Sequence, residues 1–196
     1  MVGSSILNAI KRERKNNIFI NLKRKEINFL DQHEVKNFYD QKRPDISIIA
    51  AAKVGGIFAN SNFPADFIYE NLMIQSNLIN AAYIFKTKKL LFLGSSCIYP
   101  RNAKQPINED DLLSGYLEKT NEPYAIAKIA GIKLCQSYRK QYGCDFISAM
   151  PTNLYGPGDN YHRKNSHVIP AIIGRAHEAK INDQKILTIW GTGKSK

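Results

Sequence analysis

Short apolar runs alternate with longer segments whose apolar residues recur at helical spacing. The short runs predict strands near residues 18–22, 46–51, 90–93, 146–150 and 186–190. Helical spacing predicts helices over residues 2–15, 32–40, 64–85, 123–142 and 166–180. Strands that alternate with helices are typical of βαβ units, in which helices cover both faces of a parallel sheet. The pattern therefore predicts an α/β fold with a doubly wound parallel sheet.

Reactive side chains follow the apolar strand at residues 90–93. Gly94 ends this strand, and Ser95 and Cys97 come next. Ligands of doubly wound sheets bind beyond the carboxyl ends of the strands, so Ser95 is predicted to lie where a substrate oxygen binds. If the segment stays extended, Ser95 and Cys97 point to the same side. The alternative for Cys97 is a small buried apolar residue.

A tyrosine and a lysine lie four residues apart in the helix predicted from residue 123. Asn121 fits the N-cap position and Pro123 the first turn. The spacing places Tyr124 and Lys128 on one face of the helix. A neighbouring ammonium favours the phenolate and lowers a tyrosine pKa, so the pair is suited to proton transfer at a carbonyl oxygen. The alternative is a surface pair on an amphipathic helix.

Longer motifs extend these local patterns and carry a family resemblance. They are residues 50–57, 64–69, 91–100, 121–128, 151–157 and 165–170, including Asn121-Glu122-Pro123-Tyr124-Ala125-Ile126-Ala127-Lys128. With these motifs the chain resembles the GDP-L-fucose synthase family, the NADP-dependent 3,5-epimerase/4-reductases among the extended short-chain dehydrogenases/reductases. The resemblance implies a Rossmann-like sheet, and conversion of GDP-4-keto-6-deoxy-D-mannose to GDP-L-fucose.

The resemblance also implies catalytic roles. Ser95 and Tyr124 would polarise and protonate O4 of a 4-keto sugar, with Lys128 tuning the tyrosine. Cys97 and His167 would be the acid/base pair that epimerises C3 and C5, since a thiol and an imidazole both exchange protons near neutral pH. Without the resemblance, a helix-capping or surface histidine is the favoured interpretation of His167.

The implied cofactor is NADP(H), and the implied substrate is a GDP-sugar. The cofactor-binding residues implied are Gly3, Arg24, Asn28, Leu93, Gly94, Ser95, Ser96, Lys128, Pro151, Thr152, Asn153, Leu154 and His167. Arg175 and Trp190 would contact the nucleotide-sugar; a solvated helix charge and a core aromatic are the alternatives. The basic residues 23–25 follow the predicted second strand, where such residues accommodate the 2′-phosphate of NADP.

The resemblance divides the chain into two incomplete parts. Residues 1–150 are expected to form the NADP-binding domain, and residues 151–196 the rest of its core plus the start of a substrate-binding domain. Gly3 resembles the last glycine of the dinucleotide fingerprint, whose strand and earlier glycines are expected to be missing. We therefore expect a gap between the strands at 18–22 and 90–93, low stability and weak NADP binding by this chain alone.

Charge adds a further hypothesis about partners. The chain carries 28 Lys and Arg against 17 Asp and Glu, a formal net charge of +11. A nucleic-acid-binding module is one interpretation. The basic clusters have no interleaved aromatic residues and no binding motif, so a solvated basic surface is favoured and no nucleic-acid partner is expected.

Composition restricts the remaining classes. No apolar run is long enough for a membrane span, and no signal-peptide pattern opens the chain. Cys97, Cys135 and Cys144 lack metal-ligand spacing, which predicts reduced thiols in the cytoplasm and no metal site. By resemblance, the helices at 64–85 and 123–142 would form a homodimer face. The rival hypotheses are a related nucleotide-sugar epimerase or dehydratase and a non-catalytic remnant.

Overall fold

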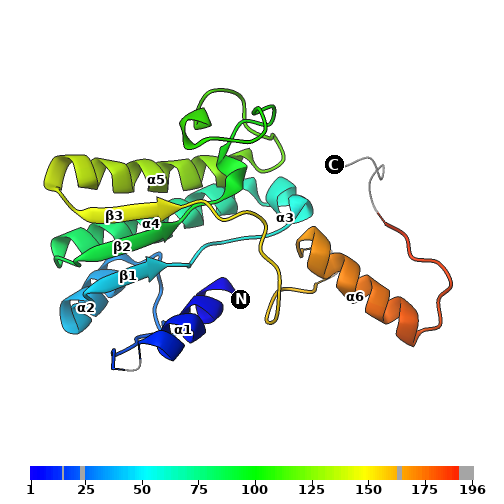
Figure 1. Cartoon of the computed structure of the whole chain (residues 1–196), viewed down its shortest axis with the longest axis horizontal. Helices are drawn as coiled ribbons and strands as arrows, with labels where there is room; N and C mark the ends of the chain where they lie inside the picture. Colours follow the sequence, from blue (N-terminus) through cyan, green and yellow to red (C-terminus); the bar gives the residue numbers. More distant parts are fainter. Residues whose placement is uncertain (15, 23–24, 163–164, 190–196) are drawn as a thin grey trace.

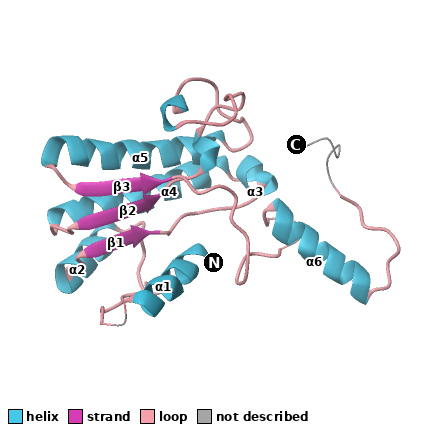
Figure 2. Ribbon diagram, in the orientation of Figure 1, coloured by secondary structure: helices cyan, strands magenta, loops and turns pink. Residues whose placement is uncertain are grey.

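The computed structural model describes residues 1–14, 16–22, 25–162 and 165–189 of the chain. Within these residues, three parallel strands form one sheet in the order β1-β2-β3, comprising β1 Ile46–Ile49, β2 Lys89–Leu93 and β3 Asp145–Ala149. Lys89 of the central strand lies opposite Ile46 on one side and Asp145 on the other. The helices are α1 Val2–Glu13, α2 Gln32–Lys42, α3 Ile57–Asn62, α4 Pro64–Ile84, α5 Glu122–Tyr142 and α6 Val168–Ile181. The predicted α/β fold with a parallel sheet is confirmed (Figures 1 and 2).

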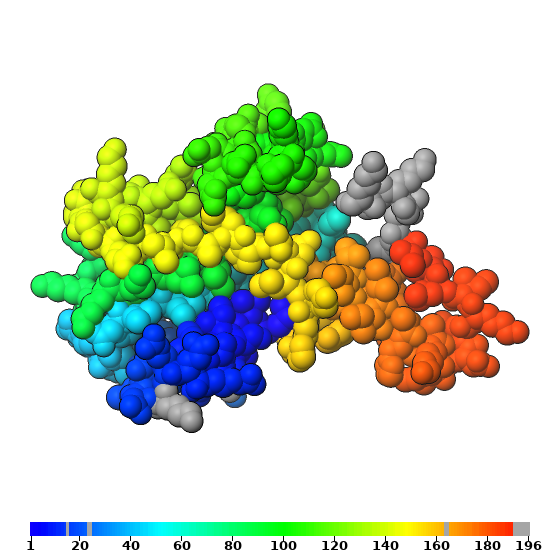
Figure 3. Space-filling model, in the orientation of Figure 1, coloured from blue at the N-terminus to red at the C-terminus, as the bar shows by residue number. Residues whose placement is uncertain are grey.

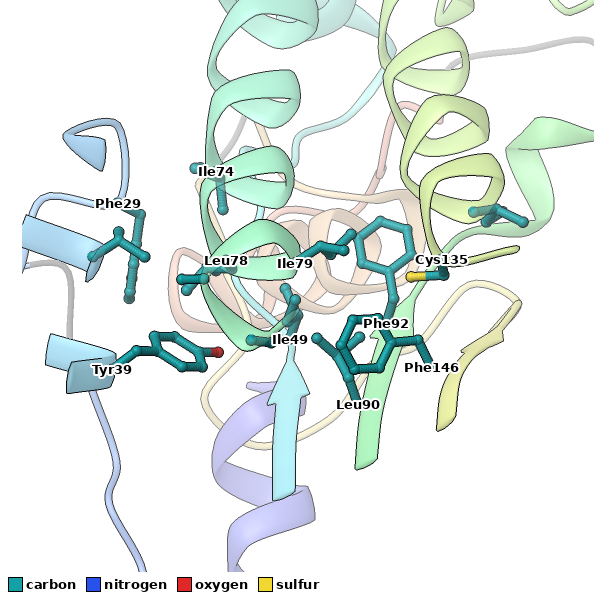
Figure 4. Packing of buried hydrophobic residues seen from close by; sticks show 14 of the residues in the cluster. Phe29, Tyr39, Ile49, Ile74, Leu78, Ile79, Leu90, Phe92, Cys135 and Phe146 are labelled. Atoms are coloured by element: carbon teal, nitrogen blue, oxygen red, sulfur yellow. The ribbon is translucent and has the colours of Figure 1, made fainter. Parts of the chain in front are cut away.

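The helices that connect the strands pack on one face of the sheet. Helix α4 follows β1 and α5 follows β2, and these two helices lie against each other with α2 beside α4. Figure 4 shows α4 and α5 on one side of the strands and α1, in pale violet-blue, on the other. The first helix approaches the sheet closely, because a Cβ built on Gly3 would lie 3.4 Å from the Cβ of Ala50, just after β1.

The core fills the space between the sheet and α2, α4 and α5. Alternate strand residues such as Leu90 and Phe92 point into it and are fully buried, as the period of two in a strand requires. Helix α5 comes close to the sheet at Gly131, where an added Cβ would lie 2.5 Å from Cζ of Phe92. The other main contributors are drawn in Figure 4: Phe29, Tyr39, Ile49, Ile74, Leu78, Ile79, Cys135 and Phe146.

Two predicted strands are wrong, and one helix was not predicted. Residues 18–22 and 186–189 have no strand structure, and residue 190 lies outside the described residues. Ile18 is 94% exposed and Ile186 81% exposed. An apolar run becomes a strand only where a neighbour accepts its backbone hydrogen bonds, and no strand of the described residues lies beside either run. Helix α3 is a six-residue helix too short for periodicity to reveal.

The expected gap also needs correction. The strand at residues 90–93 was expected to border it, yet β2 is paired on both sides, with β1 and with β3. Within the described residues, the outer strands of the sheet are therefore β1 and β3. Ile46 of β1 is 59% exposed, as a residue at a sheet edge can be.

Helix α6 lies at the end of the molecule next to α3 (Figures 1 and 3). Its exposed large apolar side chains are Val168, Ile169, Ile173 and Ile181. Among the described helices, none combines the length and the apolar character that crossing a membrane requires.

Candidate active site

The carboxyl ends of β2 and β3 and the start of α5 meet at one edge of the sheet. Beyond the strands, two further backbone hydrogen bonds continue the pairing: Gly94 N–H donates to Ala149 at 2.8 Å, and Ser96 N–H donates to Pro151 at 3.2 Å. The two segments predicted to line the cofactor, residues 93–96 and 151–154, therefore lie side by side. Helix α5 runs back from this edge, so its first turns stand over the strand ends.

Ser95 and Cys97 lie in a tight turn after β2. Residues Ser96–Ile98 form a single 3-10 turn, and the Ser95 hydroxyl accepts the Cys97 N–H at 3.3 Å. The extended conformation considered for this segment is therefore wrong. The turn brings the thiol back toward the helix, because Cys97 is close enough to influence the ionisation of Tyr124.

Tyr124 is the centre of the site. Its phenol lies close enough to the Ser95 side chain for that side chain to lower its pKa, and its ring meets the ring of Phe67 edge-on, with centroids 6.4 Å apart. Burial and, to a smaller extent, the neighbouring Cys97 raise the pKa of Tyr124 to about 12, against a lowering by the Ser95 side chain. Tyr124 is thus a protonated hydroxyl at neutral pH, able to donate a proton.

Lys128 lies one turn further along α5 and is only 4% exposed. Its Nζ donates to the backbone oxygen of Leu93 at 2.8 Å and lies 4.7 Å from the ring centroid of Phe92 and 5.9 Å from that of Tyr124. Burial lowers the pKa of Lys128 to about 8. The pKa of Tyr124 is raised, opposite to the direction expected beside an ammonium, because burial is its largest cause; a tuning effect of Lys128 on Tyr124 stays a prediction.

His167 occupies the N-cap position of α6 and is exposed, without a capping bond from its side chain. The two residues before it, Asn165 and Ser166, lie against Gly56. Gly56 N–H donates to the Asn165 oxygen at 3.2 Å, and a Cβ on Gly56 would lie 2.5 Å from the Ser166 oxygen. The structure groups Ser95, Cys97, Tyr124 and Lys128, and among the described residues no hydrogen bond joins His167 to Cys97 or Tyr124.

The remaining predicted site residues are dispersed. Arg175 is half-buried and donates to the backbone oxygens of Ala171 and Thr188, at 3.2 and 3.1 Å. Asn28 is exposed in the turn before α2, where its side chain accepts the Leu30 N–H at 3.1 Å. Gly3 lies against Ala50 at the end of β1. Arg24 and Trp190 lie outside the described residues.

The sequence reasoning missed the α4 residues that support the site. Phe67 contacts Tyr124, and the buried Gln75 donates from Nε2 to the Ala127 oxygen in the turn that carries Lys128. Asn71, also buried, binds the backbone of Lys53. A signal was present: Asn71 and Gln75 lie four apart on one face of the helix, among apolar residues such as Phe67, Ile74 and Leu78, which indicates buried polar side chains with partners.

The donor chemistry of the grouped residues fits a nicotinamide nucleotide. The Lys128 ammonium has three N–H donors, and the bond to Leu93 uses one, so others can serve ribose hydroxyls. The site lies at the carboxyl edge of a parallel sheet, where such ligands bind. Two hollows of about 430 and 360 Å³ are lined by other residues, and the second includes Phe67, the ring partner of Tyr124. Nowhere in the described residues do three His, Cys, Asp or Glu side chains gather as metal ligands would.

Comparison with known proteins supplies a context for this geometry. Residues 1–196 match the model of the NAD dependent epimerase/dehydratase family. The chain is 57% identical over 194 residues to GDP-L-fucose synthase of Escherichia coli (strain K12), covering 98% of this chain and 60% of that protein. It is 55% identical over 193 residues to GDP-L-fucose synthase 1 of Arabidopsis thaliana, covering 98% and 59%. The resemblance inferred from the motifs is confirmed.

A solved structure shows the same fold. The GDP-L-fucose synthetase of Naegleria fowleri bound to NADP superposes with a TM-score of 0.85 at 29% identity, covering 95% of this chain and 61% of that one. This chain therefore spans about 60% of the length of the curated relatives.

Proposed function

The chain belongs to the NAD dependent epimerase/dehydratase family, and from this premise we propose that it is the catalytic part of an NADPH-dependent epimerase-reductase. Its substrate would be GDP-4-keto-6-deoxy-D-mannose and its product GDP-L-fucose, as the names of the relatives suggest. The observation that carries the proposal is the grouping of the Ser95 and Tyr124 side chains at the carboxyl end of β2, with Cys97 and Lys128 beside them.

The reduction step uses the two hydroxyls. Ser95 and Tyr124 bind O4 of the keto sugar, and Tyr124 gives its proton to that oxygen as the C4–O4 double bond becomes single. When bound, NADPH would supply the hydride that C4 receives. A tyrosine whose pKa is raised to about 12 carries the proton it must donate at neutral pH.

The epimerisation step uses the thiol and the imidazole. A proton leaves C3 or C5, both acidified by the 4-keto group, for one of the two groups, and the other group returns a proton to the opposite face of the same carbon. Cys97 lies close enough to Tyr124 to affect its pKa, so a sugar bound through O4 brings its neighbouring carbons near the thiol. His167 would approach from the start of α6.

Cofactor and substrate contacts complete the proposal. Lys128 would bind the ribose, Gly3 would lie near the phosphates at the start of α1, and Asn28 with the basic residues 23–25 would favour NADP over NAD. Arg175 would bind the sugar diphosphate. Residues 1–150 are then the cofactor-binding part and residues 151–196 the beginning of the substrate-binding part.

The assembly and location are proposals as well. Helices α4 and α5 would form the homodimer face, which is supported by exposed large side chains on both: Tyr69, Ile84, Ile126 and Tyr142. The three cysteines are free thiols, which supports a reducing compartment such as the cytoplasm.

The test uses a chain of the length of its relatives. Residues 1–196 are joined to the flanking segments of the Escherichia coli relative, giving what we call the extended chain. We expect it to oxidise NADPH with GDP-4-keto-6-deoxy-D-mannose and to form GDP-L-fucose. Consumption of NADPH without inversion at C3 and C5 would instead favour a simple 4-keto reductase, and no turnover would favour a non-catalytic remnant.

A further inference from the structure

A loop of four residues, 53–56, runs from the end of β1 toward the start of α6. Its first residue is held on both backbone sides by the buried Asn71 of α4. The Asn71 Oδ1 accepts the Lys53 N–H at 2.9 Å, and its Nδ2 donates to the Lys53 oxygen at 3.0 Å. One side chain thus satisfies the backbone of Lys53 as a neighbouring strand would, and the loop begins from a fixed point.

The Lys53 side chain secures the loop to the same helix. Its Nζ forms ion pairs with Asp66, at 3.0 Å, and with Glu70, one turn along α4. The ammonium also lies 5.9 Å from the ring centroid of Phe67. The ring of Phe67 also contacts the ring of Tyr124. The side chain of Phe67 therefore connects the loop to the proposed catalytic tyrosine.

The two glycines allow close contact on both sides of the loop. A Cβ on Gly55 would lie 3.1 Å from Cζ of Phe67, and one on Gly56 would lie 2.5 Å from the Ser166 oxygen. Gly56 has a φ of −69°, which any residue adopts, so close approach and not backbone conformation excludes a side chain there. The Gly56 N–H also donates to Asn165 at 3.2 Å.

These contacts join two parts of the proposed site that share no hydrogen bond within the described residues. One side of the loop touches Phe67 and thereby Tyr124, and the other touches the two residues before His167. We propose that residues 53–56 are a positioning element that fixes His167 relative to Tyr124 and Cys97. The inference rests on the proposed function, because epimerisation is the step in which His167 would act as an acid/base group together with Cys97.

The first test separates the two chemical steps. In the extended chain, Gly56→Ala should slow the exchange of the substrate C3 and C5 protons with deuterated water by about 10- to 100-fold, since small displacements of a catalytic group have such effects. The dissociation constant for NADPH should stay within about two-fold of the parent value. Gly174→Ala is the matched control on α6, because its added Cβ would meet only an ordinary contact, 3.5 Å from the Tyr161 oxygen. Proton exchange at the parent rate in Gly56→Ala would overturn the proposal.

A second variant tests the proposal in case Gly56→Ala does not fold. Lys53→Met removes both ion pairs and leaves the backbone bonds to Asn71 in place. It should cause a smaller loss of proton exchange, again with NADPH binding retained. Equal loss of proton exchange and of NADPH binding in Lys53→Met would mean that the loop supports the whole fold, and would also overturn the proposal.

The last test does not depend on catalysis. In the 196-residue chain, the Ala171 N–H donates to the His167 oxygen at 3.0 Å in the first turn of α6. Gly56→Ala should accelerate hydrogen exchange of this amide by about 10-fold and leave the amides of β2 unchanged, because only the local opening is affected. Unchanged exchange at Ala171 would contradict the positioning role. If the extended chain itself shows no turnover, the proposed function fails. Hydrogen exchange at Ala171 still shows whether Gly56 holds the start of α6 in place.

Discussion

Lys128 of α5 donates a hydrogen bond to the backbone oxygen of Leu93, the last residue of β2, at 2.8 Å. This bond joins the helix that carries Tyr124 to the end of the strand that leads into Ser95. The sheet, and not the phenol, therefore sets the position of the Lys128 amino group. The cost is that an ammonium is held in a buried position beside the Phe92 ring.

The burial of Lys128 predicts a rise of stability with pH. Its pKa falls from 10.5 to about 8 because burial penalises the charge. Between these two pH values the unfolded chain keeps a proton that the folded chain has released, so the free energy of unfolding increases as pH rises. From about pH 7 to about pH 10 the increase is on the order of 2 kcal/mol. The measurement is urea unfolding at a series of pH values.

The matched variants are Lys128→Met and Lys133→Met. Lys133 lies on the same helix but is exposed. The rise in the free energy of unfolding with pH should disappear in Lys128→Met and persist in Lys133→Met. The second variant controls for the loss of any one lysine charge at alkaline pH. Parallel pH curves for the parent and Lys128→Met would show that Lys128 is not held as described.

The close approach of α5 to the sheet predicts that Gly131→Ala is destabilising. The added Cβ would lie 2.5 Å from Cζ of Phe92, which is fully buried and has no room to move. Overpacking costs about 1–3 kcal/mol, and the better helix propensity of alanine offsets about 1 kcal/mol. We expect a net loss of about 1 kcal/mol or more in urea unfolding.

A second substitution, Phe92→Leu, tests whether crowding at Phe92 causes this loss of stability. Combining Gly131→Ala with Phe92→Leu should cost less than the sum of the two single variants, because the shorter side chain makes room for the Cβ. Strict additivity would place the cause elsewhere. Gly174→Ala, whose Cβ has only an ordinary contact, should be neutral or stabilising.

Much of the fold follows from periodicity, and the failures have a common cause. Runs such as residues 90–93 were predicted correctly because they are buried and paired. The run at residues 18–22 has the same local pattern, but Ile18 is 94% exposed and pairs with no described strand. Pattern alone records that a run is apolar; whether it becomes a strand depends on neighbours that lie elsewhere in the chain.

The site was predictable to a similar extent. Ser95, Tyr124 and Lys128 were predicted from spacing and from their place after a strand, and the structure groups them. Two details were beyond the sequence. The turn at Ser96–Ile98 depends on a hydrogen bond between Ser95 and Cys97, and the direction of the Tyr124 pKa depends on burial by Phe67 and its surroundings.

Cys97→Ser in the extended chain should impair epimerisation more than reduction. A hydroxyl exchanges protons far less readily than a thiol near neutral pH, so exchange of the C3 and C5 protons with deuterated water should fall by about 100-fold. Hydride transfer to a ketone that has already been epimerised should fall much less. A proportionate loss of both rates would assign Cys97 a structural role.

The extended chain should bind NADPH more tightly than NADH. The proposed cause is attraction of the 2′-phosphate by the basic residues 23–25, each charge-assisted contact contributing about 1.5–3 kcal/mol. Lys25→Gln should reduce the preference and leave NADH binding unchanged. Tighter binding of NADH by the parent would contradict the assignment of NADP.

The most direct test of the central claim is the rate of hydride transfer in Tyr124→Phe of the extended chain. Phenylalanine keeps the ring beside Phe67 and removes only the hydroxyl near Ser95. A general acid contributes about 100- to 10,000-fold, so we predict a fall of at least about 100-fold in single-turnover oxidation of NADPH, with NADPH affinity unchanged. A rate within about three-fold of the parent would show that Tyr124 is not the proton donor and would contradict the account.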